Sequence, residues 1–335
     1  MKVAVYEGPH RPFRIEQRPT PEPSEDELLI KVGRCGICAT DLSTYTGAAG
    51  METGMVYGHE FAGEVVGLGR AVRGIELGQR VTAQCVTACG HCEECRRGHL
   101  VFCPEWRSHP TGGFGQFMTI PAREAYVLPA SLTIEDGALV EPLAVGLHGV
   151  RLSGLGPNSR VVVLGAGAIG LSVAFWARRL GAEKIVVTAT SERRKALAFE
   201  MGASEFITVG EDAEESIRSA LGGAPEIVFE CAGFTGAMMQ SMNWVAPKGT
   251  VVGMGYGLHP EEITTAVPLL KEIRVQFSMT YDRANYEEVI ATLAAGHLEP
   301  RCMITNTIPL EALTTAMTGL LDGAPECKVM VDPWA

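Results

Sequence analysis

The sequence has no excess of basic residues. Its 335 residues include 28 Lys and Arg against 39 Asp and Glu, which gives a formal net charge of −11 at pH 7. Proteins that bind nucleic acids or anionic membranes usually present basic patches, so neither partner is expected. Residues 1–7 lack the apolar core of a secretory signal peptide. We also find no internal repeat and no low-complexity segment. These absences favour a cytoplasmic location.

Four of the ten cysteines lie close together in the sequence, at Cys89, Cys92, Cys95 and Cys103. Four thiolates at such short spacings can surround one tetrahedral Zn²⁺ ion, with each sulfur about 2.3 Å from the metal. Such a site is closed to water and substrate, so we expect it to hold a lobe of the fold together rather than to take part in a reaction. Disulfides or a run of buried thiols are the alternative interpretations.

A second candidate metal site has a different set of donors, Cys38, His59 and Glu60. One thiolate, one imidazole and one carboxylate suit zinc. Three protein ligands leave the fourth position to water or substrate, as a catalytic zinc requires. With five cysteines assigned to metal, a reducing cytoplasm fits best. We expect the remaining cysteines to be buried small hydrophobic residues; they are Cys35, Cys85, Cys231, Cys302 and Cys327.

Residues 161–177 are apolar apart from one serine, but their order argues against a membrane span. Four β-forming residues lead into a Gly-x-Gly-x-x-Gly turn, and helix-compatible residues follow it. This order of strand, tight turn and helix is typical of dinucleotide-binding folds, in which the pyrophosphate lies at the N-terminus of the helix. The residues of the turn are Gly165, Gly167, Ala168, Ile169 and Gly170.

The pattern of predicted secondary structure differs between the two parts of the chain. After residue 160, predicted strands alternate with helices, which indicates a parallel, doubly wound α/β sheet. These strands are expected at 184–188, 226–229, 250–253 and 273–277. Before residue 150, short β-rich runs broken by Gly and Pro indicate a mostly antiparallel β domain. They lie at 28–32, 63–67, 80–83 and 117–120.

These motifs together resemble the zinc-dependent medium-chain alcohol dehydrogenases, and within them the sorbitol, polyol and butanediol dehydrogenases. The resemblance spans essentially the whole chain. It is carried by residues 35–41, 58–60 with Gly63 and Gly69, the four cysteines, 141–145, the dinucleotide turn and 304–333. It implies a discontinuous GroES-like catalytic domain of irregular antiparallel strands, residues 1–149 and 285–335. A Rossmann domain, residues 150–284, would be inserted in it, and the chain would form a homodimer or homotetramer.

The resemblance also implies roles for the second metal site. Cys38 and His59 would bind the catalytic zinc, Glu60 would be a ligand or a close carboxylate, and Glu141 stands where other alcohol dehydrogenases have a second cysteine. Whether Glu60, Glu141 or water completes the coordination stays open at this point. Alternatively, Glu141 is a surface carboxylate before a helix that starts at Pro142, although its apolar neighbours favour the metal.

Thr40 matches the hydroxyl that, in the family, passes the alcohol proton toward the cofactor ribose. It would otherwise be a strand-edge threonine that caps a turn with Asp41. Ser43 occupies a position at which many relatives have a histidine as the outer proton shuttle, and serine cannot store a proton near neutral pH. Solvent, His109 or Tyr45 would have to replace that histidine.

The second strand of the dinucleotide fold lacks the acidic residue that binds the ribose hydroxyls of NAD. Ala189 occupies this position, and Ser191, Arg193 and Arg194 follow it. A hydroxyl and two guanidinium groups suit a 2′-phosphate, so we predict that NADP(H) is preferred. The alternative is that both arginines are solvated charges at the start of a helix and that NAD(H) is used.

The predicted activity is therefore zinc-dependent hydride transfer between NADP(H) and a secondary alcohol or polyol and its ketone, with two zinc ions per chain. Amino alcohols such as threonine are a further possible substrate class. Two other classes share this architecture: zinc-free quinone or enoyl reductases, which lack the metal ligands, and non-catalytic binding or structural proteins recruited from the fold. The fold by itself does not decide between these classes.

Overall fold

The structure is a computed structural model that describes residues 1–108 and 112–335. The chain divides into two compact units, Met1–Glu141 with Asp282–Ala335 (unit 1) and Pro142–Tyr281 (unit 2). The first boundary lies inside helix α3 (Ile134–Leu152), and the second lies just before helix α9 (Arg283–Ala294). The predicted boundaries near residues 149 and 285 fall inside the same two helices. His109 lies outside the described residues.

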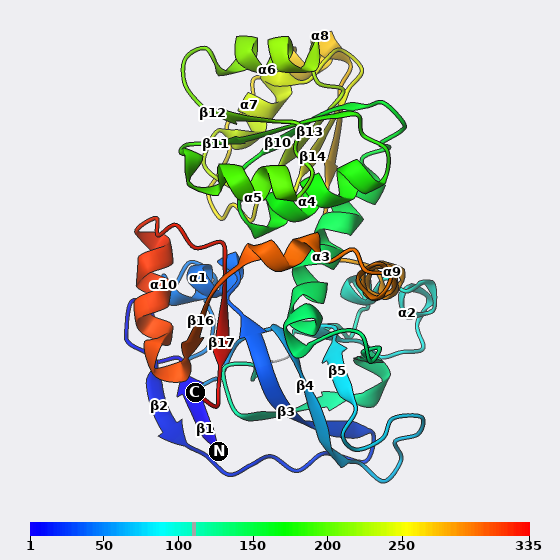
Figure 1. Cartoon of the computed structure of the whole chain (residues 1–335), viewed down its shortest axis with the longest axis vertical. Coiled ribbons are helices and arrows are strands. Elements are labelled where there is room, and N and C mark those ends of the chain that lie inside the picture. Colours follow the sequence, from blue (N-terminus) through cyan, green and yellow to red (C-terminus); the bar gives the residue numbers. More distant parts are fainter. Residues whose placement is uncertain (109–111) are drawn as a thin grey trace. The chain divides into compact units, whose positions relative to one another are not determined.

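Unit 1 is built on a seven-stranded sheet in the order β16-β17-β3-β4-β5-β9, with β8 also paired to β3 (Figure 1). Its pairs are antiparallel except for β16 and β17. The strands are β3 (Glu27–Gly36), β4 (Glu60–Leu68), β5 (Arg80–Ala83), β8 (Phe117–Pro121), β9 (Ala125–Val127), β16 (Ile304–Pro309) and β17 (Lys328–Asp332). The predicted mostly antiparallel β domain is confirmed.

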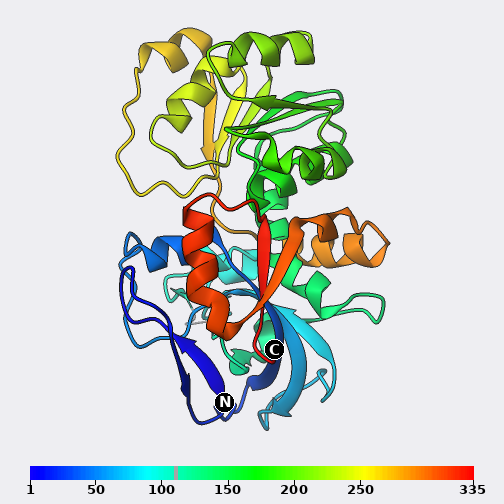
Figure 2. The ribbon, with the colours of Figure 1, turned by 60° about the vertical axis from the view of Figure 1, so that its left-hand side comes forward.

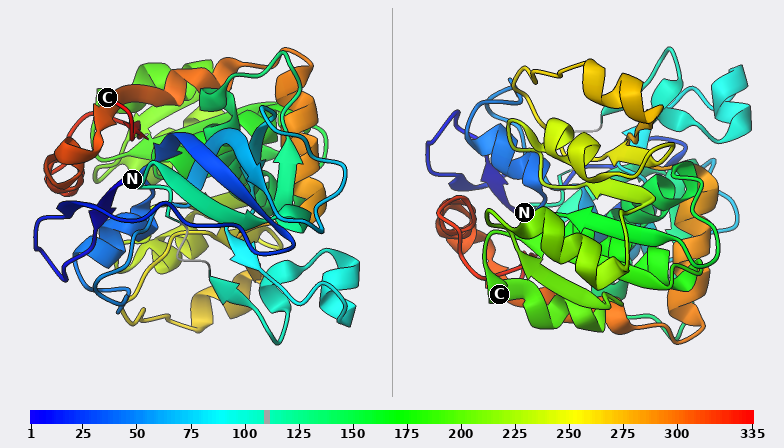
Figure 3. Two further views of the ribbon diagram at one scale, coloured as in Figure 1. Left: turned by 90° about the horizontal axis from the view of Figure 1, so that it is seen from below. Right: turned by 90° about the horizontal axis from the view of Figure 1, so that it is seen from above.

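Unit 1 also contains two small sheets and three further α-helices. The sheets are β1 (Lys2–Val5) with β2 (Arg14–Gln17), and β6 (Val86–Thr87) with β7 (Arg107–Ser108). The helices are α1 (Ala39–Tyr45), α2 (Glu93–Arg97) and α10 (Leu313–Leu321). The segment around α2 lies at the periphery of unit 1 in both views of Figure 3.

The C-terminal strand β17 lies between β16 and β3, and it pairs with the end of β3 through Met330–Gly36 and Val331–Cys35 (Figure 2). Alternate residues of β3, Leu28, Ile30 and Val32, are fully buried in the core, as expected for a strand with one face packed against apolar neighbours. The pairing places the tail of the chain beside the segment that contains Cys38.

Unit 2 contains a six-stranded, fully parallel sheet in the order β12-β11-β10-β13-β14-β15. The strands are β10 (Arg160–Leu164), β11 (Lys184–Ala189), β12 (Glu205–Thr208), β13 (Ile227–Glu230), β14 (Thr250–Gly253) and β15 (Arg274–Phe277). The helices are α4 (Ala168–Arg179), α5 (Lys195–Glu200), α6 (Ala213–Leu221), α7 (Ala237–Trp244) and α8 (Ala266–Lys271). The predicted doubly wound sheet is confirmed.

Helices cover both faces of this sheet, with α4 and α5 on one side and α6 and α7 on the other (Figure 1). The central strand β10 is therefore apolar along its length, and Val161, Val162 and Val163 are fully buried. The strand order reverses at β10, which is the place where open α/β sheets bind ligands at the carboxyl ends of their strands. Residues 161–177 thus form a buried strand, a turn and a helix, and no helix in the described part of the chain is long and apolar enough to cross a membrane.

Candidate active site and metal sites

The four cysteines predicted to share a metal ion lie together in space. Any two of the sulfurs of Cys89, Cys92, Cys95 and Cys103 lie within 4.8 Å of each other. The Cys89 and Cys95 sulfurs are 3.8 Å apart, which matches the edge of about 3.8 Å that a tetrahedron has when each Zn–S bond is about 2.3 Å. The donor set therefore fits a tetrahedral zinc ion.

Backbone N–H groups in this lobe point at the sulfurs. Cys92 N donates to Cys89 Sγ at 3.3 Å, and Cys89 N donates to Cys103 Sγ at 3.3 Å. Such bonds stabilise thiolates, and the backbone of His91 and Cys92 lowers the pKa of the Cys89 thiol to about 6. None of the ten cysteines forms a disulfide, so the disulfide alternative is wrong.

The expectation for the remaining cysteines holds only in part. Cys35 and Cys327 are buried, whereas Cys85, Cys231 and Cys302 are partly exposed.

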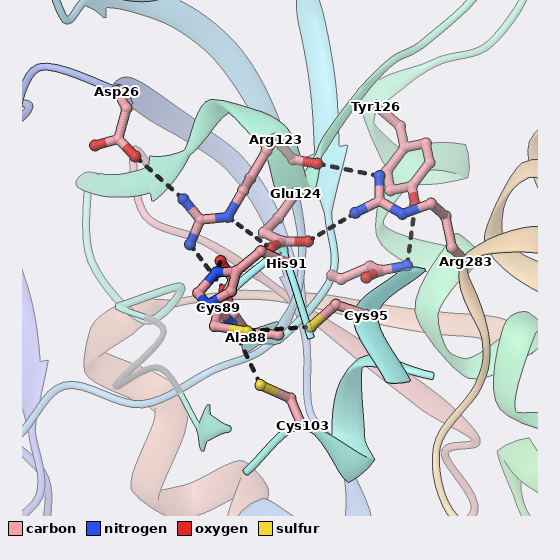
Figure 4. A network of polar contacts seen from close by, with 11 residues as sticks. Asp26, Ala88, Cys89, His91, Cys95, Cys103, Arg123, Glu124, Tyr126 and Arg283 are labelled. Atoms are coloured by element: carbon pink, nitrogen blue, oxygen red, sulfur yellow. Dashed lines mark hydrogen bonds and ion pairs between the residues drawn. The ribbon is translucent and has the colours of Figure 1, made fainter. Parts of the chain in front are cut away.

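Arginine side chains fix the four-cysteine lobe to the body of unit 1 (Figure 4). Arg123 Nη2 donates to the carbonyl of Ala88 at 3.1 Å, and Arg123 Nε lies 3.2 Å from the buried Glu124 carboxylate. Arg283, at the start of α9, contacts the other oxygen of Glu124 at 3.2 Å and donates from its backbone to Gly98 O. These contacts attach the lobe to the body of unit 1.

The second predicted site is assembled where β3 ends and β4 begins. Gly36 and Glu60 are paired in the sheet, so Cys38, just beyond β3, meets His59, just before β4. Ligand atoms of Cys38, His59 and Glu60 lie within 4.8 Å of one another. A side chain at Gly36 would overlap the Glu60 carboxylate, so the close approach of the two strands depends on glycine at this position.

Asp41 orients this site. Its Oδ2 accepts a hydrogen bond of 2.8 Å from Cys38 N and caps α1, while its Oδ1 lies 3.7 Å from His59 Nδ1. Burial alone would lower the pKa of His59, but the neighbouring Asp41, Cys38 and Glu141 raise it well above its ordinary value. A cluster of anionic groups around one imidazole is a suitable environment for a divalent cation.

Lys328, the first residue of β17, was not predicted as part of the site. Its Nζ contacts Glu60 Oε1 at 2.7 Å and Oε2 at 2.5 Å, and it donates to Ile37 O at 3.0 Å. The exposed fraction is 2% for Lys328 and 0% for Glu60. A charged residue at the start of the apolar run Val329–Val331 was the available signal, because lysine is seldom fully buried unless it is paired.

Glu141 is 5% exposed and lies inside α3. The alternative of a surface carboxylate before a helix that starts at Pro142 is therefore wrong, because Pro142 is also inside α3. Burial raises the pKa of Glu141 to about 7, and the nearby His59 acts in the opposite direction. Glu141 is close enough to His59 to interact electrostatically, but it is not among the three residues whose ligand atoms lie within 4.8 Å of one another.

Thr40 lies in helix α1, with Oγ1 at 3.4 Å from His59 Nε2. The alternative of a strand-edge threonine is wrong, and the cap of the helix is formed by Cys38 and Asp41. Ser43 donates to Ala39 O at 3.2 Å. Tyr45 is buried, and its hydroxyl lies 3.5 Å from Thr318 Oγ1. This contact fits a packing role for Tyr45 better than a proton shuttle.

In unit 2, the predicted dinucleotide turn joins β10 to α4. Gly165 has a φ of +108°, and a side chain at Gly170 would overlap the carbonyl of Gly165, so both positions need glycine. Gly167 is the N-cap of α4 and has no side chain to cap the helix. Ala168 and Ile169 form the first turn, whose N–H groups suit a pyrophosphate.

The second strand, β11, ends at Ala189 as predicted. Ser191 is the N-cap of the short 3₁₀ helix Glu192–Arg194. Arg194 Nη1 donates to Ala166 O at 3.3 Å, so this guanidinium lies against the dinucleotide turn. The acidic Glu192 is paired with Lys195 at 2.9 Å.

Comparisons with known proteins agree with this arrangement. Residues 24–130 match the alcohol dehydrogenase GroES-like domain, and residues 168–295 match the zinc-binding dehydrogenase domain. The chain is 33% identical to the sorbitol dehydrogenase of Bacillus subtilis (strain 168), over 99% of this chain and 97% of that protein.

Two solved structures are similar along the same length. A zinc-binding dehydrogenase from Sinorhizobium meliloti 1021 bound to NADP has a TM-score of 0.90 and 32% identity, covering 99% of each chain. The 2R,3R-butanediol dehydrogenase from Bacillus subtilis has a TM-score of 0.88 and 27% identity, again covering 99% of each chain.

Proposed function

Because this chain belongs to the zinc-dependent medium-chain alcohol dehydrogenases, in the branch of the sorbitol and polyol dehydrogenases, we propose that it transfers a hydride between NADP(H) and a secondary alcohol or polyol. The chain is an alcohol or polyol dehydrogenase by family; the preferred cofactor, the role of zinc and the kind of alcohol are the proposal. The observation that carries it is the cluster of Cys38, His59 and Glu60, whose mixed donors leave room for a further ligand.

Cys38 and His59 would hold the catalytic zinc, with Glu141 or Glu60 as the carboxylate. When bound, zinc would polarise the alcohol oxygen and favour loss of its proton. Lys328 holds the Glu60 carboxylate in place beside Cys38 and His59. Thr40, next to His59, would accept the alcohol proton on Oγ1 and pass it on.

The four-cysteine lobe would hold a second, structural zinc. Its four thiolates leave no position for a substrate. The arginine contacts described above attach it to the body of unit 1, so its role would be to maintain the fold around residues 85–108.

NADP(H) is the cofactor that the ribose end of unit 2 favours. Ala189 offers no carboxylate that would repel a 2′-phosphate, while Ser191, Arg193 and Arg194 offer donors to one. The position of Arg194 against the dinucleotide turn supports this choice. The similar structure from Sinorhizobium meliloti is also bound to NADP.

We further propose that the chain forms a homo-oligomer through unit 2. Strand β15 is the edge of the parallel sheet, and an edge strand can pair with a copy of itself. Phe277 on this strand is 66% exposed, and Leu269 and Leu270 in the preceding α8 are 76% and 83% exposed. Large exposed apolar side chains beside an open edge are typical of an interface. A cytoplasmic location, suggested by cysteines without disulfides, remains a prediction.

A spectrophotometric screen of polyols, vicinal diols, amino alcohols and simple secondary alcohols tests this function. We expect reduction of NADP⁺ by at least one secondary alcohol, weaker reduction of NAD⁺, and loss of both after chelation. Activity that survives complete removal of zinc would indicate a zinc-free reductase instead. No turnover of any alcohol or ketone by zinc-loaded protein would favour a non-catalytic protein.

A further inference from the structure

Two exposed residues beside the four-cysteine site complete another set of metal donors. Ligand atoms of Cys89, His91 and Glu105 lie within 4.8 Å of one another. His91 and Glu105 are exposed, whereas Cys103 of the four-cysteine set is 4% exposed. Figure 4 shows His91 next to Cys89. Cys89 thus belongs to two sets, one partly buried and one open to solvent.

The imidazole of His91 is held in a form that can bind a cation. Its Nδ1 lies 3.0 Å from the carbonyl oxygen of Cys89. A carbonyl can only accept, so Nδ1 carries the hydrogen of this bond and Nε2 of the neutral ring keeps its lone pair. This is the arrangement common in metal-binding histidines, in which one nitrogen is fixed by a backbone carbonyl and the other is the ligand.

A zinc ion enclosed by four thiolates has no open coordination position. The ion can leave when other donors replace the cysteines one at a time, and it can enter when the cysteines replace such donors in turn. A donor set that shares one cysteine with the closed site, and that offers an imidazole and a carboxylate to solvent, meets this requirement. Imidazole and carboxylate both suit zinc but bind it less strongly than a set of thiolates.

We propose that Cys89, His91 and Glu105 form a transfer site through which a divalent ion enters and leaves the four-cysteine site. An incoming ion binds the His91 imidazole, the Glu105 carboxylate and the Cys89 thiolate. It then exchanges the first two donors for Cys92, Cys95 and Cys103 while Cys89 stays bound. Each thiol that binds releases its proton to solvent, and no electrons are transferred. This inference rests on the proposed four-cysteine metal site.

Cadmium is a suitable probe, because its bonds to several thiolates give an ultraviolet absorption that one cysteine at the other metal site cannot match. The full-length protein is loaded with Cd²⁺, and the absorption is followed after addition of excess EDTA and, separately, after addition of Cd²⁺ to the metal-free protein. His91→Asn keeps a side-chain N–H for the carbonyl of Cys89 but removes the imidazole. Glu105→Gln removes only the charge.

We expect each variant to slow both release and uptake about tenfold, the low end of what such neighbouring donors contribute to metal binding. The bound fraction at equilibrium should stay close to that of the wild type, because a transfer site changes both rates alike. Glu93→Gln, a matched loss of charge on another exposed residue of the lobe, should leave both rates unchanged.

Unchanged rates in His91→Asn and Glu105→Gln would overturn the transfer site. So would faster release with weaker binding, which is the result expected if the imidazole of His91 only supports the fold of the lobe by packing. A wild-type protein that shows no thiolate–cadmium absorption would overturn the four-cysteine metal site itself, and this inference with it.

Discussion

Replacement of Lys328 by methionine tests the buried ion pair beside the candidate catalytic site. Lys328 Nζ makes contacts of 2.7 and 2.5 Å with the two oxygens of Glu60 and one of 3.0 Å with Ile37 O. Methionine fills most of the same volume without the charge. The Glu60 carboxylate, which is 0% exposed, would lose its cation.

The expected cost can be worked out from these contacts. A hydrogen bond to a charged group contributes about 1.5–3 kcal/mol, and Glu60 loses two of them. Removal of one partner of a buried ion pair costs about 3–5 kcal/mol in other proteins. We therefore expect the free energy of unfolding of the metal-free protein to fall by about 3–5 kcal/mol. Bound zinc should reduce this difference in free energy of unfolding between the variant and the wild type, because a cation near Glu60 offsets its charge.

Urea-induced unfolding of EDTA-treated protein measures this difference. Glu60→Gln combined with Lys328→Met removes both charges and should recover most of the loss. Lys195→Met, which breaks an exposed pair with Glu192, is the control and should cost no more than about 1 kcal/mol. If Lys328→Met stays within about 1 kcal/mol of the wild type, in the range of an exposed pair, the reasoning is refuted.

Three further predictions concern the cofactor, the fold and the proton path. Arg194→Ala should lower kcat/KM for NADP by about tenfold to 100-fold, because one charged hydrogen bond to the cofactor is lost, and it should leave kcat/KM for NAD unchanged. Equal losses of kcat/KM for both cofactors would contradict the 2′-phosphate assignment. Asp136→Asn should cost about 3 kcal/mol at pH 7 in denaturant unfolding, because it breaks the pair of 2.7 and 2.8 Å with Arg301. Burial raises the pKa of Asp136, but Arg301 and Thr133 lower it below its ordinary value. The contribution of the Asp136–Arg301 pair to the free energy of unfolding should therefore be complete above the pKa that Asp136 has in the unfolded chain, and it should disappear as pH falls through the lower pKa of the folded protein. A cost of Asp136→Asn that does not change with pH would contradict this account. Thr40→Ala should reduce kcat by about 100-fold and alter its pH profile, and Thr40→Ser should restore both; unchanged turnover in Thr40→Ala would exclude the relay.

Patterns over a few neighbouring residues predicted the features whose geometry depends on interactions within a short stretch of chain. The spacing of the four cysteines and the Gly165–Gly170 turn each place their groups within a few residues, so their geometry follows from short stretches of chain. The strands of unit 2 were predicted because a parallel sheet covered on both faces needs continuous apolar runs such as Val161–Leu164.

Features that depend on contacts distant in sequence could not be predicted in this way. Lys328 meets Glu60 only because β17 returns beside β3, and no local pattern indicates that pairing. Pro142 suggested the start of a helix, since proline suits the first turn, but it lies inside α3. Tertiary packing of the buried segment around Glu141 overrides that local preference.

The most direct test of the central claim is the zinc content of Cys38→Ser, measured with its dehydrogenase activity. The wild type should hold two zinc ions per chain. The variant should hold one, keep the four-cysteine site and the fold, and lose its activity. A folded Cys38→Ser protein that retains two zinc ions and full activity would contradict a catalytic metal held by Cys38 and His59.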